Sequence, residues 1–338
     1  MTKTDRQGRS PTIKDVAQAA GVSSATVSYV LNNLNKVTPE VDAHVRRIAN
    51  ELGYHRNRAA TALKTGRNHA IGCIVPSLVS PVFPEITQAV QQRAEELGFA
   101  TFVIDSGAGE LREAQAARTL LKHGVDGAVA VLSTHSRIVE RPIFPLVAID
   151  RQIAGLDSVQ ADHHIGGRMM AEHAIALGHR KVGLLSGEQD LLSSRQRRDG
   201  FVEAARGRLD IAWDIEVPLL STLPAEAVNA VGRKDVSLIA CVNDLVAISA
   251  LSVLRRNGID VPKQVSVIGF DDMQWSSWPL IDLTTIRQPL AELGRRAVEL
   301  LIRRLNDPQS DTENVVLPVS LVKRASTARP GGSGDETG

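Results

Sequence analysis

The segment TIKDVAQAAGVSSATVSYVLNN, residues 12–33, contains two short helical patterns separated by about three residues. Thr12 can cap the first helix, and Gly21 can end it because glycine readily adopts the left-handed conformation that closes a helix. The second pattern follows Ser23, and its apolar residues recur at helical spacing. They are Val27, Val30 and Leu31. Two helices joined by so short a turn are typical of a helix-turn-helix motif.

A third helical pattern follows closely. The pair Thr38-Pro39 is a strong start signal, because threonine caps a helix and proline suits its first turn. Gly53 marks the end of this pattern. Its expected inward-facing residues are Val41, Val45, Ile48, Ala49 and Leu52. The N-terminal segment therefore predicts a small all-α domain of three helices.

Positive charge is concentrated in this N-terminal segment. Residues 1–68 contain eleven Lys or Arg against five Asp or Glu, whereas residues 69–338 contain 28 against 33. The net charge of the whole chain is only +1. A small basic domain followed by a larger acidic one predicts that only the first domain meets the phosphates of a nucleic acid.

From about residue 70 the pattern changes to short apolar strands that alternate with amphipathic helices. A first set comprises AIGCIVP, ATFVID, GAVAVL and LVAID, and a second set comprises KVGLLSG, SLIACVN and VSVIGFD. Apolar strands alternating with helices predict parallel sheets covered on both faces. Two similar sets predict two α/β lobes with a ligand-binding cleft between them.

Composition indicates a cytoplasmic protein without a membrane partner. No apolar run approaches the roughly 20 residues that a membrane helix needs, and the polar, basic start lacks the apolar centre of a signal peptide. Cys73 and Cys241 are the only cysteines and lie in apolar strand-like runs. We expect buried, reduced thiols, and the sequence predicts neither a metal site nor a cofactor.

The N-terminal segments resemble the lac repressor/gal repressor (LacI/GalR) family of bacterial transcriptional regulators. The resemblance covers residues 12–33, then VTPEVDAHVRRIANELGY and NRAATALKTG. It continues in the family's order through almost the whole chain, with SPVFPEI, GVDGAVAV, VAIDR, DSVQADHHIGG, LGHRKVGLLSG, SRQRRDGF, VNDLVAISAL, VSVIGFDD and LTTIRQP. So many ordered matches are far more specific than a helix-turn-helix pattern alone.

The resemblance implies an all-α helix-turn-helix headpiece followed by a two-lobed α/β domain like that of periplasmic binding proteins. We expect the headpiece in residues 1–56, a hinge helix and linker in 57–68, and the effector-binding and dimerisation domain in 69–327. The Gly-rich end, residues 328–338, is expected to be a disordered tail.

In this family the second helix of the motif enters the major groove of DNA. The resemblance therefore makes Ser24, Ala25, Thr26 and Tyr29 the candidate DNA contacts. Alternatives remain open. Ser23 or Ser24 can simply cap the helix, Ala25 can merely allow close approach, and Tyr29 can lie over a phosphate.

The segment from Asn57 to Lys64 resembles the family's hinge helix. Leu63 corresponds to the residue that wedges between base pairs in the minor groove. An apolar residue between Arg58 and Lys64, in a segment too short for a stable isolated helix, suits a helix that orders only on DNA. The alternative is an interdomain linker with one packed leucine.

Candidate effector contacts follow the apolar strand patterns, because ligands of open α/β sheets bind beyond the carboxyl ends of the strands. Asp150 ends LVAID, Asn243 and Asp244 follow IACV, and Asp271 with Asp272 follows VSVIGF. Asp244 suits a helix cap, and we interpret it as structural. The family's effector contacts map onto Asp150, Arg197, Asn243, Asp271 and Gln288.

The chemistry of these residues suits a neutral, polyhydroxylated ligand. Carboxylates accept hydroxyl hydrogen bonds, Asn243 can donate and accept, and Arg197 can balance the acids. A sugar or polyol is therefore expected. Sugar sites also need an apolar wall, for which Phe83 and Trp275 are the candidates, and Val82 stands where the family often has an aromatic residue.

Catalysis and metal binding are alternatives for the same cleft. Two carboxylates can act in glycoside hydrolysis, but the order of motifs favours binding. The adjacent His163 and His164 can suggest a metal, but neighbouring side chains at a helix start diverge and no third ligand is placed by spacing. We interpret them as solvated or capping residues, and we predict no enzyme activity.

The resulting prediction is a homodimeric DNA-binding transcriptional regulator, a repressor, that binds a pseudo-palindromic operator in double-stranded DNA. A small sugar-like effector in the cleft is expected to control its affinity. One alternative is a regulator that responds to a nucleobase corepressor. Another is an enzyme or solute-binding protein with a vestigial headpiece.

Overall fold

The computed structural model describes residues 11–31, 34, 36–54, 66–107, 109–220 and 222–331. Contacts along the chain divide it into two units, Met1–Asn68 and His69–Gly338. The proposed hinge contacts Asn57, Leu63 and Lys64 lie outside the described residues.

The described residues of the first unit form three helices, α1 (Ile13–Ala20), α2 (Ser24–Leu31) and α3 (Pro39–Glu51), as the sequence predicts. Gly21 ends α1 with a left-handed φ of 66°, which turns the chain toward α2. The buried core comprises Val16, Ala17, Ala20, Val27, Val30, Val45 and Ala49. Leu52, expected in this core, is 40% exposed because it follows the last turn of α3, and Tyr54 packs against the core instead.

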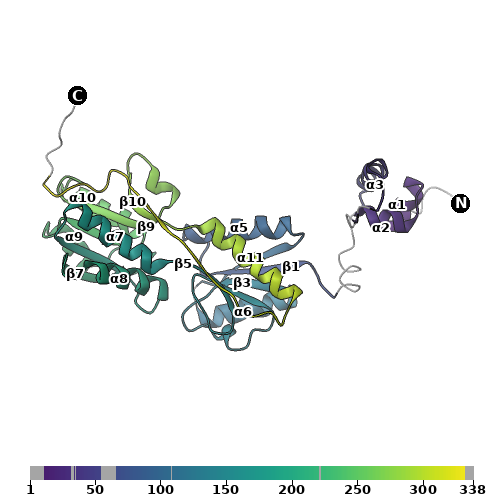
Figure 1. Cartoon of the computed structure of the whole chain (residues 1–338), viewed down its shortest axis with the longest axis horizontal. Coiled ribbons are helices and arrows are strands. Elements are labelled where there is room, and N and C mark those ends of the chain that lie inside the picture. Colours follow the sequence, from purple (N-terminus) through teal and green to yellow (C-terminus); the bar gives the residue numbers. More distant parts are fainter. Residues whose placement is uncertain are drawn as a thin grey trace, which may run out of the picture. The chain divides into compact units, whose positions relative to one another are not determined.

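The second unit contains two six-stranded sheets (Figure 1). The first has the order β11-β5-β4-β3-β1-β2 and is parallel throughout. Its strands are β1 (Ala70–Val75), β2 (Ala100–Asp105), β3 (Gly127–Val131), β4 (Leu146–Ile149), β5 (Asp157–Ala161) and β11 (Asn314–Leu317).

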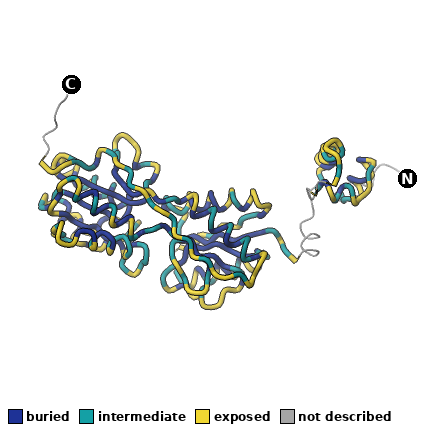
Figure 2. Tube along the Cα trace, viewed as in Figure 1, coloured by how far each residue is buried: buried dark blue, intermediate teal, exposed yellow. Residues whose placement is uncertain are grey.

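The second sheet has the order β12-β10-β9-β8-β6-β7, and only β12 runs antiparallel to its neighbour. Its strands are β6 (Lys181–Gly187), β7 (Asp210–Val217), β8 (Leu238–Cys241), β9 (Ser266–Asp271), β10 (Thr284–Arg287) and β12 (Ser320–Val322). The central strands of both sheets are buried along their length (Figure 2), which explains their continuous apolar sequences.

Helices cover both faces of each sheet. In the first lobe, α5 (Val82–Glu96) and α11 (Leu290–Asn306) pack on one face and α6 (Glu110–Lys122) on the other. In the second lobe, α7 (His163–Leu177) and α8 (Leu192–Ala205) pack on one face, and α9 (Ala225–Gly232) and α10 (Asp244–Arg256) on the other. The described part of the unit also contains the 3₁₀ turns η1 (Arg137–Val139) and η2 (Gln274–Ser277).

The lobes are discontinuous in sequence. The chain passes from β5 to α7, returns from β10 to α11, and crosses again from β11 to β12 (Figure 1). The last helix therefore belongs to the first lobe, although it follows all the main strands of the second lobe.

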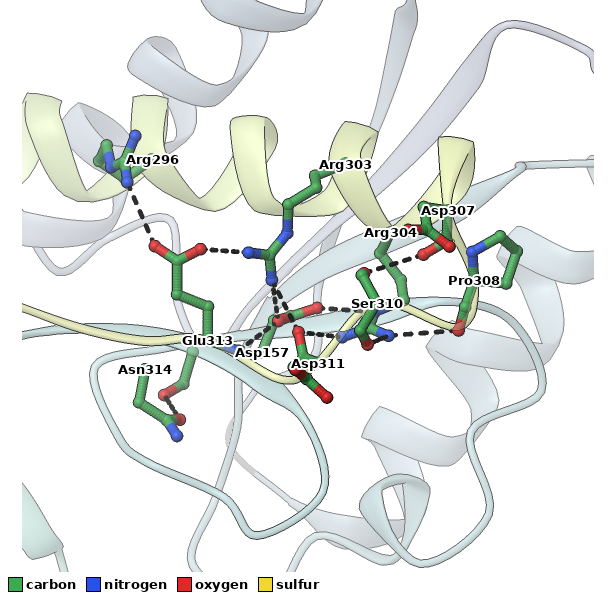
Figure 3. A network of polar contacts seen from close by, with 11 residues as sticks. Asp157, Arg296, Arg303, Arg304, Asp307, Pro308, Ser310, Asp311, Glu313 and Asn314 are labelled. Atoms are coloured by element: carbon green, nitrogen blue, oxygen red, sulfur yellow. Dashed lines mark hydrogen bonds and ion pairs between the residues drawn. The ribbon is translucent and has the colours of Figure 1, made fainter.

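A buried carboxylate fixes the returning segment to the first lobe (Figure 3). Asp157, only 1% exposed at the start of β5, accepts hydrogen bonds from Arg303 at 2.7 Å and Arg304 at 2.9 Å on α11. The backbone N–H of Glu313 donates to the same carboxylate at 2.8 Å, and its side chain also contacts Arg303. These contacts hold α11, β5 and the start of β11 together.

The second unit contains both cysteines and the start of the C-terminal segment. Cys73 and Cys241 are buried and unpaired, as expected. The sequence places Ala328 in the disordered tail, but this is wrong, because its N–H donates to Ser266 Oγ at 3.1 Å at the start of β9. No helix in the described part of the chain is long and apolar enough to cross a membrane.

Candidate functional site

The N-terminal end of α2 presents the residues that the sequence singled out for DNA contact. Ser24, Ala25 and Tyr29 are exposed and Thr26 is half-buried, whereas Val27 between them is fully buried. The Ser23 hydroxyl accepts the N–H of Thr26 at 3.0 Å. Ser23 is thus the capping residue, and the side chain of Ser24 is not needed for that role.

A contact that the sequence did not indicate fixes α2 on α3. Arg46 Nη2 donates to the Val30 carbonyl oxygen at 2.9 Å, near the C-terminal end of α2. Asp42 orients the guanidinium through an ion pair of 2.6 Å. The Lys36 ammonium lies 5.2 Å from the centre of the Tyr29 ring, which adds positive charge beside the exposed tyrosine.

The second unit contains a cavity of about 430 Å³ between its lobes. Most of its polar lining residues follow the carboxyl ends of strands, where such folds bind ligands. Six of the seven sequence-predicted effector residues line it, namely Phe83, Asp150, Arg197, Asn243, Asp271 and Gln288.

Asp271 is the centre of the polar wall in the second lobe. Its Oδ1 accepts hydrogen bonds from Gln288 Nε2 at 2.7 Å and from Arg197 Nη1 at 3.3 Å. Arg197 also donates to the Val242 carbonyl oxygen at 2.8 Å, and its guanidinium carbon lies 3.9 Å from the centre of the Phe270 ring. These contacts hold the guanidinium in one place before any ligand arrives.

A histidine connects this wall to the first lobe. His163 Nε2 lies 2.7 Å from Asp150 Oδ1, and Arg197 Nε donates to His163 Nδ1 at 3.3 Å. The His163 side chain is completely buried at the first turn of α7. The interpretation of His163 as a solvated or capping residue is therefore wrong, because Asp162 caps α7 and the ring packs between the lobes.

The two cavity carboxylates have opposite pKa shifts. Burial raises the pKa of Asp271 to about 7, and the neighbouring Asp244 adds to this effect, although Arg197 acts in the opposite direction. Burial also disfavours the charged form of Asp150, but the hydrogen bonds from His163 and Ser193 and the charge of Arg197 favour it, and the pKa of Asp150 is lowered. Asp150 is therefore an anionic acceptor, whereas Asp271 titrates near neutral pH.

Asn243 and Asp244 have roles that differ in detail from those expected. Asn243 caps α10, because its Oδ1 accepts the Val246 N–H at 2.8 Å, and its Nδ2 donates to the Leu219 carbonyl oxygen at 3.2 Å. Asp244 is structural but is not the cap. Its carboxylate accepts hydrogen bonds from the Met273 N–H and from the hydroxyls of Ser276 and Thr285, and burial raises its pKa to about 6.

Trp275 is not among the residues that line the cavity, contrary to expectation. It lies in η2 between Met273 and Ser276, and Asp244 holds both neighbours in the second lobe. The cavity wall is instead mainly aliphatic, with Phe83 as an aromatic member. Other apolar lining residues include Val82, Ile86, Leu132, Leu191, Leu192, Leu219, Leu220, Leu290 and Leu293.

His164 is half-buried with 43% of its side chain exposed, and its Nε2 lies 3.1 Å from Glu203, so the two adjacent histidines do diverge. Among the described residues, no group of three or more His, Cys, Asp or Glu side chains is placed to hold a metal ion.

A basic helix-turn-helix unit joined to a two-lobed α/β unit with a polar cavity defines the class of ligand-responsive transcriptional regulators. Residues 12–57 match the model of bacterial regulatory proteins, lacI family, and residues 171–327 match the periplasmic binding protein-like domain. The HTH-type transcriptional repressor PurR of Pasteurella multocida is 30% identical over 327 residues, which cover 93% of this chain and 98% of PurR. The chain therefore belongs to the lacI family of bacterial regulatory proteins.

Solved structures agree with this assignment. The lac repressor dimer bound to operator and the anti-inducer ONPF has a TM-score of 0.78 at 29% identity, covering 95% of this chain and 100% of that one. The complex of the transcriptional regulator CelR with cellobiose has a TM-score of 0.68 at 26% identity, and the match covers 94% of this chain and 99% of CelR. The predicted class, a DNA-binding transcriptional regulator and not an enzyme, is confirmed.

Proposed function

We propose that this regulator binds a pseudo-palindromic operator in double-stranded DNA as a homodimer, and that a sugar or polyol in the interlobe cavity controls its affinity. It acts in the cytoplasm, where bacterial operators lie. The observation that carries the effector assignment is the convergence of Asp150, Arg197 and Asp271 on one cavity of about 430 Å³.

The donors and acceptors of this cavity favour a ligand with several hydroxyl groups. Asp150 accepts hydroxyl hydrogen bonds as an anion, and Arg197 supplies donors beside it. Asn243 uses Oδ1 and one Nδ2 hydrogen within the protein, and its second amide hydrogen is a further donor at the cavity wall. Phe83 and the aliphatic residues supply the apolar wall against which the C–H face of such a ligand packs.

The headpiece provides the sequence-reading surface. Ser24, Ala25 and Thr26 start the helix that enters the major groove, and Tyr29 lies one turn further along it. We propose that Asn57 and Lys64 contact DNA next to the wedge residue Leu63, so Leu63→Ala should weaken operator binding. One headpiece contacts too few base pairs for genomic specificity, which is why two headpieces related by a dimer axis are needed.

The first experiment is a thermal-shift screen of the full chain with sugars, polyols and nucleobases. A ligand at 100 times its Kd stabilises the folded state by about 2.7 kcal/mol. We expect a polyhydroxylated compound to raise the Tm and to change operator affinity in fluorescence anisotropy. A response to nucleobases alone would exclude the sugar class.

Arg197→Ala tests the site itself, and Arg195→Ala is the matched control because Arg195 is exposed on the same helix. Arg197→Ala removes a guanidinium that lines the cavity, and truncating a buried charged contact costs about 2–5 kcal/mol of binding. We expect loss of the effector response with operator binding retained, and no change in the control. Undiminished effector affinity in Arg197→Ala, measured by calorimetry, would reject this site.

A further inference from the structure

His163 has hydrogen-bonding chemistry that its two neighbours determine. Arg197 Nε carries a hydrogen and has no lone pair to offer, so His163 Nδ1 must accept at their 3.3 Å contact. An imidazolium has no acceptor, and a ring protonated on Nδ1 has none at that atom. The contact therefore requires the neutral ring with its proton on Nε2, which then donates to Asp150 Oδ1 at 2.7 Å.

The surroundings of the ring leave it little freedom to turn. The His163 side chain is fully buried, and its centroid lies 6.0 Å from that of Phe270, which also supports the Arg197 guanidinium. His163 is not itself among the cavity-lining residues, whereas Asp150 and Arg197 are. The ring therefore acts from behind the cavity wall, through the two residues that it touches.

The three residues also come from different lobes. Asp150 follows β4 in the first lobe, whereas His163 starts α7 and Arg197 lies in α8 of the second lobe. Asp150 has a positive φ of 70°, so its backbone conformation is one that few residues adopt. Hydrogen bonds from His163 and Ser193 of the other lobe fix where its carboxylate points.

We propose that His163 is a positioning residue of the effector site, a neutral imidazole protonated on Nε2 that aligns Asp150 of one lobe with Arg197 of the other. This inference rests on the proposed effector function of the cavity. The one ring orients both Asp150, a hydrogen-bond acceptor for the ligand, and Arg197, a donor. These two side chains therefore reach their binding geometry only when the lobes are placed so that His163 contacts both.

The first test needs no effector. The full chain is prepared with ¹⁵N-labelled histidine, and long-range ¹H–¹⁵N spectra at pH 7 distinguish the two neutral tautomers from the imidazolium. The His163 signals are assigned by their loss in His163→Gln. We expect a protonated Nε2 and an unprotonated Nδ1; a proton on Nδ1, in either the other tautomer or the imidazolium, overturns the proposal.

The second test separates the two hydrogen bonds. A glutamine amide can replace Nε2 as the donor to Asp150, and an asparagine oxygen can replace Nδ1 as the acceptor for Arg197, whereas leucine replaces neither. Calorimetry uses the polyol with the largest effect in the thermal-shift screen, or ribose if no compound raises the Tm. His164→Gln is the matched control, because the His164 side chain lies at the same helix start, is 43% exposed and contacts Glu203 instead of Asp150 or Arg197.

We expect His163→Leu to weaken ligand binding at least 30-fold, His163→Gln and His163→Asn to weaken it less, and His164→Gln to leave it unchanged. Equal affinity of His163→Leu and the wild type would overturn the positioning role, and so would Gln and Asn variants both as weak as Leu. If wild-type protein binds no polyol but shows the expected tautomer, the proposed effector class fails while the hydrogen-bond assignment stands.

Discussion

Gly200 permits the close contact between α7 and α8 on which the polar wall of the cavity depends. A Cβ atom placed on Gly200 would lie 2.0 Å from the His164 carbonyl oxygen and 3.1 Å from the Arg168 nitrogen. Both are backbone atoms, so no side chain can rotate away to make room. Gly200→Ala should therefore push the two helices apart near His163 and Arg197.

The size of the displacement follows from the contact distance. Real Cβ contacts essentially never fall below 3.0 Å, so the helices must separate by at least about 1 Å. The Arg197–His163 hydrogen bond, already 3.3 Å long, is then too long to persist. Overpacking of this kind costs about 1–3 kcal/mol of stability. We expect effector affinity to fall about tenfold or more, since tenfold corresponds to about 1.4 kcal/mol.

Thermal unfolding and effector calorimetry of Gly200→Ala measure the two effects, and operator anisotropy checks that the headpiece is intact. Gly232→Ala is the matched control, because a Cβ at the end of α9 meets its nearest atom, in Asn257, at an ordinary 3.5 Å. A Gly200→Ala protein that kept both the Tm and the effector affinity of the wild type would contradict this helix separation. A Gly232→Ala control that lost as much of either quantity would contradict it equally.

The cavity carboxylate Asp271, the buried Asp157 and the exposed Tyr29 can each be tested by one substitution. Effector affinity should rise from pH 6 to pH 8, because hydroxyl donors bind the ionised Asp271 carboxylate and burial raises the pKa of Asp271 to about 7 in the free protein. In calorimetry, Asp271→Asn should remove this pH dependence. A wild-type affinity that does not change with pH would contradict the prediction. Asp157→Asn should lower the free energy of unfolding, measured in urea, by about 3 kcal/mol. This is the low end of the cost of breaking a buried ion pair, because the Arg303 side chain is 36% exposed. A loss below about 1 kcal/mol would mean that the contacts of Asp157 with α11 are dispensable. Tyr29→Ala should change the operator sequence that the protein selects from randomised DNA, because Tyr29 is exposed on α2. An unchanged sequence preference with weaker binding to every sequence would show that Tyr29 contacts phosphates instead of bases.

The elements with local signals could be predicted from the sequence. Gly21 and Pro39 mark helix boundaries through their own backbone preferences: α1 ends just before Gly21, and α3 begins at Pro39. The apolar strand patterns indicated where polar residues would emerge at strand ends. That rule led to Asp150 and Asp271, which lie at the cavity because parallel strands direct their carboxyl ends to one edge of a sheet.

The features that depend on distant parts of the chain could not be predicted. The pairing of β11 with β5 joins Val315 to Val159, and nothing in either local sequence specifies it. His163 looked like an exposed residue at a helix start, because the sequence does not show that the first lobe places Asp150 against it. Trp275 has the right chemistry for a sugar wall, but it does not line the cavity, and the Asp244 hydrogen bonds that hold η2 in the second lobe are equally non-local.

The distribution of contacts between the lobes limits which ligands can act as switches. Hydrogen bonds beside the cavity join the lobes directly. Asp150 accepts from His163 and Ser193 of the second lobe, and the Thr134 hydroxyl donates to the Asp190 carbonyl oxygen at 2.8 Å. A ligand shifts a conformational equilibrium only by its difference in affinity for the two states, and moving it from 99:1 to 1:99 takes about 5.5 kcal/mol. A compound that touched only the Arg197–Asp271 wall would bind both lobe arrangements alike. An effector must therefore also reach Asp150, so that its own hydrogen bonds, like that of His163, depend on how the lobes are placed.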